Sequence, residues 1–451
     1  MKTSYILLVI AICFFGVSCT KEFLDEKPKS SLMVPKTLAD LRALMDDPYI
    51  FISSGSPSLA WVSSDDFVAP DNYVKTLSAT EREAYLWEKA MGGNDLDWFY
   101  CYQQIFNANI VLDRLPEIEA QNKEYVFLKG TALFWRSFAF YNLLENYAKP
   151  FNIATESADL GVPLRLTSDV NIRMGRGTVK EGFERIISDL KTAVELLPVN
   201  EKYNTRPTRN SATALLARIY LTMGDFRNAG IFADLSLKLN DRLLHYRELD
   251  ANKARPFPLG ISGQNQEIIL YTCMTKLGFI KSALVGVVPE LYRQYQNGDL
   301  RKEMYFESKG KELYVFKGSY TGNNDYFGGL TTREQYLIRA ECFAREGKIE
   351  LAMNDLNKLL ASRWDNSFKP LTVTDKEDVL ALILRERRKE LVGQGLRFSD
   401  LRRLNQEQVT ATTLRRKFDG KEYLLPPNDI RYVFLIPEQE IQLTGIEQNI
   451  R

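Results

Sequence analysis

The sequence predicts a mainly α-helical protein in which tetratricopeptide-like helix pairs form an α-α superhelix, with irregular loops and a few short strands inserted. Three observations predict this fold. Apolar residues recur at helical spacing on two faces of 128–143, which is typical of a helix in a protein interior. Two later segments share one pattern of helix, glycine turn and helix. The stretch between them, 241–331, lacks that periodicity and is predicted to be rich in loops.

The chain begins with the features of an export signal. Lys2 precedes an apolar run from Tyr5 to Phe15, and small residues then lead to Cys19. The run is shorter than the roughly 17 to 25 apolar residues of a bilayer-spanning helix. A cysteine after small residues is where lipoprotein maturation adds acyl chains, so we expect 1–18 to be a lipoprotein signal peptide and Cys19 to be lipidated. An ordinary signal peptide with an incidental cysteine is the alternative.

After this signal, the chain is expected to form a tether and one domain. Residues 19–36 are polar and punctuated by proline, which suits a flexible linker between lipid and domain. Residues 37–451 are numerous enough for one large helical domain. Helix pairs are expected near 105–148, 180–240 and 332–362.

The two helix–glycine–helix segments can be aligned on Gly224 and Gly347. Each has a small residue seven positions before the glycine, an aromatic residue four before it and a small residue five after it. Small residues let antiparallel helices approach, the aromatic ring fills the space beside them, and glycine takes the left-handed cap. The residues concerned are Ala217, Tyr220 and Ala229 in the first segment and Ala340, Phe343 and Ala352 in the second.

Charge and residue usage exclude several classes of protein. The chain has 59 basic and 58 acidic side chains, so no global field attracts nucleic acid. Cys101, Cys273 and Cys342 cannot all pair with one another, which favours buried thiols over a disulfide scaffold. His245 is the only histidine, which excludes a two-histidine zinc site, and we expect it to be packed or on the surface. No metal, cofactor or catalytic residue is predicted.

Two irregular regions are the candidates for a binding surface. The insertion contains a predicted strand, 267–273, and a loop, 317–329. The region 47–100 holds three of the five tryptophans outside clear helical periodicity. Because function is often carried by loops on a rigid scaffold, aromatic density here predicts ligand binding. Two of these tryptophans, Trp87 and Trp98, are expected to lie in the core.

A sugar-binding site is the chemistry that best suits these regions. The C–H faces of sugar rings pack on flat aromatic side chains, while amide and charged groups bind hydroxyl groups. Large exposed aromatic residues signal recognition more often than packing. The candidate ligand-binding residues are Trp61, Tyr73, Asn94 and Asp95 in the first region and Tyr320, Asn323, Asn324 and Tyr326 in the second.

Charged residues near the C-terminus predict salt bridges that hold the scaffold together. Arg397 and Asp400 are three residues apart on a predicted helix or turn, so we expect them to pair. Asp65 and Asp66 resemble a catalytic or calcium-binding pair, but no second acidic cluster has loop spacing, so a capping or turn role is predicted.

Several separated motifs together resemble the SusD/RagB family, surface lipoproteins of Bacteroidetes that cap a TonB-dependent outer-membrane transporter and take up glycans or peptides. The most specific is an arginine-rich helix followed by a Gly-x-Arg-aromatic-x-Asp-Leu-x-Arg signature. The resemblance runs nearly from end to end of the chain. The motifs are Ser64-Asp65-Asp66, Ile105-Phe-Asn-Ala-Asn109, Leu160-Gly-Val-Pro163, Arg206-Pro-Thr-Arg-Asn-Ser-Ala212, Arg387-Arg-Lys-Glu-Leu391, Gly395-Leu-Arg-Phe-Ser-Asp-Leu-Arg-Arg403 and Leu435-Ile-Pro-Glu-Gln-Glu-Ile441.

The resemblance implies a function in nutrient uptake. The expected role is a lipid-anchored protein on the outer membrane, facing the cell exterior, that captures oligosaccharides and delivers them to a SusC-like TonB-dependent transporter barrel. The same role with peptides as cargo is the main competing hypothesis, because extended peptides can bind through main-chain hydrogen bonds. A periplasmic adaptor of the tetratricopeptide type and a surface glycoside hydrolase are also compatible with the sequence, although no motif places an acid against a base.

Overall fold

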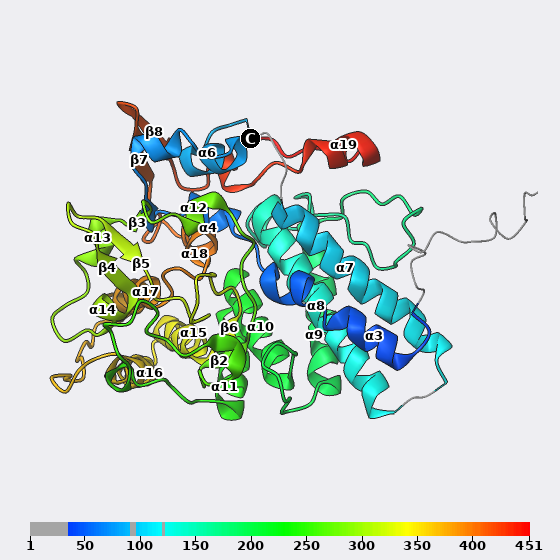
Figure 1. Cartoon of the computed structure of the whole chain (residues 1–451), viewed down its shortest axis with the longest axis horizontal. Helices are drawn as coiled ribbons and strands as arrows, with labels where there is room; N and C mark the ends of the chain where they lie inside the picture. Colours follow the sequence, from blue (N-terminus) through cyan, green and yellow to red (C-terminus); the bar gives the residue numbers. More distant parts are fainter. Residues whose placement is uncertain (1–34, 91–95, 120–121) are drawn as a thin grey trace, which may run out of the picture. The chain divides into compact units, whose positions relative to one another are not determined.

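Consecutive helices pack against one another along the chain and form the scaffold (Figure 1). The computed structural model describes residues 35–90, 96–119 and 122–451. Residues 38–451 form one compact unit. The scaffold helices are α3 (Leu38–Met45), α7 (Leu96–Arg114), α8 (Lys123–Tyr147), α9 (Val179–Leu196), α10 (Arg209–Thr222), α11 (Phe226–Leu239), α15 (Thr332–Arg345), α16 (Ile349–Ala361), α17 (Lys376–Glu390) and α18 (Arg397–Leu404).

The first four long helices pack in chain order, α7 on α8, α8 on α9 and α9 on α10. Their starts are set by local caps: Asn122 accepts hydrogen bonds from the first turn of α8, and Thr178 forms a capping box with Glu181 at α9. Nearly all side chains of α8 from Phe127 onward are buried. The prediction that this helix lies in the interior, made from its two apolar faces, is therefore confirmed.

The two predicted glycine turns are confirmed. Gly224 joins α10 to α11 with φ of +73°, and Gly347 joins α15 to α16 with φ of +77°, both in the left-handed region that favours glycine. The two hairpins are neighbours in space, because α11 packs on α15 across the long insertion. A Cβ atom at Gly230 of α11 would lie 3.2 Å from the Cβ of Cys342 on α15, so close helix approach depends on glycine there.

The insertion and the N-terminal loop region share a small sheet. β1 pairs with β3, β3 with β5 and β5 with β4, all antiparallel, while β2 pairs with β6 and β7 with β8. The predicted strand 267–273 is represented by β2. The strands are β1 (Phe67–Val68), β2 (Ile268–Leu270), β3 (Gly286–Val287), β4 (Phe306–Ser308), β5 (Tyr314–Phe316), β6 (Leu330–Thr331), β7 (Leu414–Phe418) and β8 (Lys421–Leu425).

Short helices lie between these strands and at the end of the chain (Figure 1). They are α4 (Leu59–Ser63), α5 (Asp71–Val74), α6 (Ala79–Leu86), α12 (Gly278–Lys281), α13 (Pro289–Tyr292), α14 (Arg301–Tyr305) and α19 (Glu438–Thr444). None of the helices in the described part of the chain is long and apolar enough to cross a bilayer. His245 is exposed, in agreement with its predicted surface or packing role.

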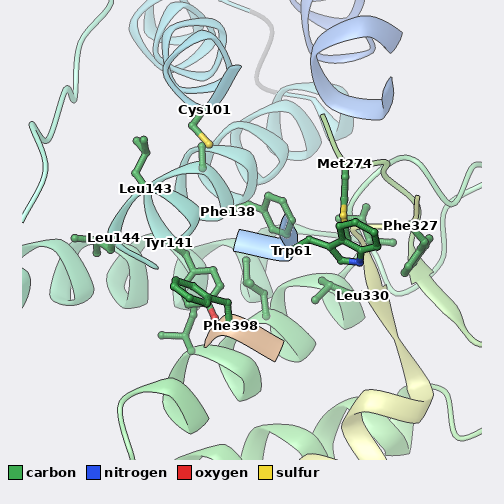
Figure 2. Packing of buried hydrophobic residues seen from close by; sticks show 14 of the residues in the cluster. Trp61, Cys101, Phe138, Tyr141, Leu143, Leu144, Met274, Phe327, Leu330 and Phe398 are labelled. Carbon is green, nitrogen blue, oxygen red and sulfur yellow. The ribbon is translucent and has the colours of Figure 1, made fainter. Parts of the chain in front are cut away.

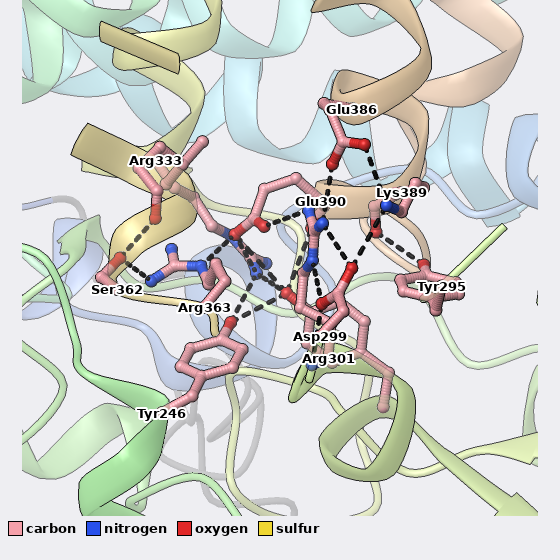
Figure 3. Close-up of polar contacts among 12 residues, drawn as sticks. Tyr246, Tyr295, Asp299, Arg301, Arg333, Ser362, Arg363, Glu386, Lys389 and Glu390 are labelled. Carbon is pink, nitrogen blue, oxygen red and sulfur yellow. Dashed lines mark hydrogen bonds and ion pairs between the residues drawn. The ribbon is translucent and has the colours of Figure 1, made fainter. Parts of the chain in front are cut away.

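A buried ionic cluster attaches the insertion to the helices. Figure 3 shows Arg301, Arg333 and Arg363 around Glu390 of α17. The guanidinium-to-carboxylate distances from Glu390 are 3.1, 3.5 and 2.8 Å, respectively. The rest of the cluster, Asp299, Glu386, Lys389 and Glu267, brings it to four carboxylates and four cations. These groups come from the insertion and from the helical segment that follows it, so the cluster joins segments that are distant in sequence.

The arginines of the C-terminal signature form ion pairs within the scaffold, but their partners differ from the predicted ones. Arg397 pairs with Asp65 at 2.7 Å, whereas Asp400 pairs with Arg387 at 2.8 Å and with Arg403 at 2.9 Å. The expected pair of Arg397 and Asp400 is therefore wrong. Arg397 is the first residue of α18, and its side chain extends to the 64–66 turn instead of along its own helix.

Asp65 and Asp66 lie in a turn, as predicted, and their carboxylates also form ion pairs that were not predicted. Arg388 of α17 reaches the carboxylate of Asp66 at 2.8 Å and that of Asp65 at 3.1 Å. Both carboxylates are therefore partners in ion pairs that attach the N-terminal loop region to the C-terminal helices. These pairs fix packing, as charged groups enclosed by a scaffold commonly do.

The three cysteines in the described part of the chain are buried and form no disulfide, as predicted. Burial raises the pKa of the Cys273 thiol to about 11 and also raises the pKa of Cys342. The reactive species is the thiolate, which these environments disfavour.

We expect brief treatment of the native protein with a maleimide at neutral pH to leave Cys101, Cys273 and Cys342 unmodified. In denaturant, all three should react, because unfolding exposes them and removes the burial that raises the pKa of Cys273 and Cys342. Mass spectrometry of the digested protein measures labelling at each cysteine separately. Labelling of native Cys273 at the rate seen in denaturant would contradict its burial.

Candidate functional site

The two irregular regions singled out from the sequence meet in the structure. β1 of the first region pairs with β3 of the insertion. The Tyr73 hydroxyl donates to the carbonyl oxygen of Gly278 over 3.0 Å, and the backbone N–H of Phe279 donates to Glu81 over 2.8 Å. Segments about two hundred residues apart in sequence therefore form one surface.

A cavity of about 280 Å³ opens at this junction. Its wall combines apolar side chains with hydroxyl groups, carboxylates and one ammonium group, which is a mixture suited to a ligand with both ring faces and hydroxyl groups. The lining residues are Leu59, Ser78, Thr80, Glu81, Leu96, Asp97, Lys276, Leu277 and Gly278.

The carboxylates of this cavity are held by hydrogen bonds. Asp97 is 2 % exposed and accepts from the backbone N–H groups of Ser58 and Leu59 and from the Thr275 hydroxyl. Burial raises the pKa of Asp97, and the hydrogen bonds from Thr275 and Leu59 oppose that rise. Glu81 accepts from Phe279 and from the Ser78 hydroxyl, the latter over 2.7 Å. Both carboxylates therefore hold segments of the cavity wall together by hydrogen bonds.

The ammonium group of Lys276 lies on the solvent-exposed side of the cavity. Its side chain is 45 % exposed and pairs with Asp325 at 3.2 Å. Such an exposed pair is weak, so Lys276 can exchange its partner for a ligand hydroxyl at small cost.

Several predicted ligand residues lie where a ligand can reach them. Tyr73, Asn323 and Tyr326 are half-buried, and Asn324 is exposed. The side-chain oxygen of Asn324 accepts a hydrogen bond from the Nε of Arg255 over 3.0 Å. Asn94 and Asp95 lie outside the described residues.

Trp61 and Tyr320 do not have the exposure expected of them. Trp61 is 2 % exposed, and Figure 2 shows it among buried side chains that include Met274 and Phe327. The expectation that it offers a face to a ligand is corrected, because its ring is covered by the insertion. Trp87 and Trp98 are buried, as predicted.

Tyr320 belongs to the interior for a different reason. It is 1 % exposed, and its hydroxyl donates to Glu267 over 2.8 Å and shares a hydrogen bond with the Tyr246 hydroxyl. The guanidinium carbon of Arg333 lies 3.6 Å from its ring centre. The side chain is thus part of the surroundings of the buried ionic cluster, and its expected ligand contact is corrected.

An aromatic surface on α7 was not predicted from the sequence. Phe99 is 52 % exposed, and Tyr102 and Phe106 are half-buried beside it. With Val170 and Leu443 they line a groove of about 420 Å³. The three aromatic residues are separated by three and four positions, a helical spacing that could have shown that they share one face.

The described residues contain no obvious metal centre. Within 35–90, 96–119 and 122–451, no group of three or more His, Cys, Asp or Glu side chains is arranged to hold a metal ion.

Comparisons with known proteins agree on one family. A family model described as "Starch-binding associating with outer membrane" matches residues 22–221, and the SusD family model matches 330–448. SusD-like protein P2 of Formosa agariphila is 25% identical over 236 residues, which cover 51% of this chain and 44% of that protein. The chain thus matches less than half the length of this relative.

Solved structures show the same fold. A SusD superfamily protein of Bacteroides thetaiotaomicron superposes with a TM-score of 0.75 at 22% identity, covering 92% of this chain and 100% of the other. A SusD-like carbohydrate binding protein of Bacteroides vulgatus gives 0.69 at 20% identity, covering 91% and 97%. The mainly α-helical fold with helical repeats is confirmed. Because two SusD-family models match residues 22–221 and 330–448, the chain belongs to the SusD/RagB family.

Proposed function

We propose that this protein captures oligosaccharides at the outer surface of the outer membrane and passes them, chemically unchanged, to a SusC-like TonB-dependent transporter barrel. In this proposal Cys19 carries the lipid anchor, 19–36 is the tether and 37–451 is the binding domain. The observation that carries it is the meeting of two distant loop regions around a polar cavity with Tyr73 beside it.

The chemistry of this junction suits a sugar. The half-buried ring of Tyr73 can pack on the C–H face of a pyranose, and Lys276, Ser78 and Thr80 provide hydroxyl-binding groups at the cavity wall. Glu81 and Asp97 are engaged by hydrogen bonds from backbone N–H groups, which suits positioning of the wall. Binding without bond cleavage is therefore the role that these residues support.

Replacing Tyr73 with Ala is expected to weaken oligosaccharide binding about fivefold, because the variant loses the ring surface and an aromatic contact contributes on the order of 1 kcal/mol. Isothermal titration of the purified full-length protein with a panel of oligosaccharides measures the change. Tyr73→Phe keeps the ring and loses only the hydrogen bond to Gly278, so it should bind nearly as the parent does. Tyr203→Ala removes a 47 % exposed tyrosine from another loop and serves as the control.

The cargo and the partner are tested separately. If the protein binds peptides from a parallel panel and none of the oligosaccharides, the proposed cargo is wrong. Cleavage of a bound oligosaccharide that disappears in a carboxylate variant would replace capture by catalysis. Gentle extraction from native membranes should recover a TonB-dependent barrel with this protein, and recovery without any barrel would contradict the proposed delivery step.

A further inference from the structure

A second cavity, of about 560 Å³, lies between the C-terminal end of α8, α18 and the C-terminal segment. Its volume is in the range of about 300 to 1,000 Å³ that is usual for small-molecule sites. It is distinct from the cavity beside Tyr73, because the two are lined by different residues. Its lining includes Lys149, Ala158, Asp159, Arg176, Arg402 and Ile430.

Arg402 places a buried positive charge in the wall of this cavity. The residue is 2 % exposed, and its two terminal nitrogens donate to the carbonyl oxygens of Tyr432 and Ala148 over 2.6 and 2.8 Å. Its Nε has no hydrogen-bond acceptor among the residues that the structure covers. Burial lowers the pKa of Arg402, which reflects the cost of keeping its charge away from water.

Arg176 adds a second guanidinium group whose hydrogen bonds go to carbonyl oxygens. Its Nε donates to Gly161 over 2.7 Å, and its terminal nitrogens donate to the backbone of Glu447 and the side-chain oxygen of Asn449 over 3.0 and 2.8 Å. Burial lowers the pKa of Arg176 as well. Carbonyl oxygens satisfy the N–H groups of a guanidinium but leave its net charge in place.

The acidic groups near the cavity are mostly engaged elsewhere. Asp159 pairs with Lys149 at 2.6 Å, and Asp429 pairs with Arg431 at 2.8 Å. The Glu447 side chain is exposed to solvent, and its charge partly opposes the effect of burial on the pKa of Arg176. Glu145, whose field reaches Arg402, is buried and accepts a hydrogen bond from Ser399. The two arginines therefore face the cavity with less negative charge than an ordinary buried ion pair provides.

We propose that this cavity binds a small organic carboxylate about the size of a hexuronic acid. The carboxylate would lie on the side of Arg176 and within the field of Arg402, while the body of the ligand would pack on the apolar wall that includes Pro150, Val433 and Ile430. An anion here offsets two guanidinium charges whose hydrogen bonds go to neutral carbonyl oxygens. The proposal stands independently of oligosaccharide capture at the other cavity.

The test is titration of the full-length protein with sodium glucuronate and, separately, with glucose as the uncharged analogue. Glucuronate is expected to bind at least tenfold more tightly than glucose at low ionic strength, and its affinity should fall as salt is added. Tyr73→Ala should bind glucuronate as the parent does, which separates this site from the proposed oligosaccharide site.

A cavity-filling variant provides the matched comparison. Ala158 is exposed at the cavity rim, so Ala158→Trp should block entry and reduce glucuronate affinity at least tenfold without changing the denaturation midpoint. Ala154→Trp adds the same side chain to an exposed position of the same loop that does not line the cavity, and it should bind normally. Arg402→Gln should weaken binding of glucuronate but not of glucose. Equal binding of glucuronate and glucose, no binding at about 10 mM, or equal affinities for the two tryptophan variants would overturn the proposal.

Discussion

Replacing Glu390 with Gln is expected to lower the free energy of unfolding by about 3–5 kcal/mol, the usual result of removing one partner from a buried charge cluster. The side chain is 0 % exposed, and its carboxylate lies within 3.5 Å of three buried guanidinium groups. The variant keeps the shape of the side chain and leaves the cluster with one uncompensated positive charge. The cluster joins the insertion to α15 and α17, so its loss affects both.

Chemical denaturation followed by circular dichroism measures this effect. Glu377→Gln, on the exposed first turn of the same helix, makes the same chemical change without burial and should shift the free energy of unfolding by less than about 0.5 kcal/mol. Similar shifts in the two variants would contradict the importance of the cluster.

The parent protein and Glu390→Gln should also differ in how their stability depends on pH in acid. Burial alone raises the pKa of Glu390, but the surrounding guanidinium groups outweigh it and hold the pKa below its ordinary value of 4.5. A depressed pKa means that the ionised group stabilises the folded state above pH 4.5 and that this contribution is lost as pH falls towards the folded-state pKa. The parent should therefore lose more stability below pH 4.5 than Glu390→Gln does.

Replacing Trp61 with Ala is expected to cost about 3–5 kcal/mol of stability, as for other large aromatic residues in a core. The Trp61 ring is surrounded by Phe67, Tyr326 and Phe279, with ring centres 4.1, 5.2 and 5.7 Å away. Two of these partners, Phe279 and Tyr326, belong to the insertion. The cavity left by alanine would therefore loosen the junction of the two loop regions.

Trp61→Phe distinguishes packing from ligand contact. The indole N–H of Trp61 has no hydrogen-bond acceptor among the described residues, so phenylalanine retains part of the packing and removes an unsatisfied donor. We expect Trp61→Phe to cost less than half as much stability as Trp61→Ala and to bind oligosaccharide normally, as measured by denaturation and titration. If Trp61→Ala instead keeps full stability and loses binding, then Trp61 contacts the ligand and does not act mainly by packing in the core.

The burial of Trp61 and Tyr320 could not be read from the sequence. An aromatic residue in a loop region has the same local pattern whether its ring faces solvent or a distant segment. Trp61 is covered by residues more than two hundred positions later, and Tyr320 hydrogen-bonds to Glu267. The number of possible long-range partners is too large for local composition to choose among them.

The helical scaffold, in contrast, follows from short-range patterns. The turns at Gly224 and Gly347 and the interior position of α8 depend on residues within one or two helical turns, where spacing alone decides which side chains share a face. Only the tertiary structure decided the long-range contacts. It places α11 against α15 across the insertion, and it pairs Arg397 with Asp65 rather than with Asp400. It also leaves Arg176 and Arg402 in the wall of a cavity. Those outcomes depend on which distant groups compete for the same charge or surface, and such competition is settled only when the whole chain has packed.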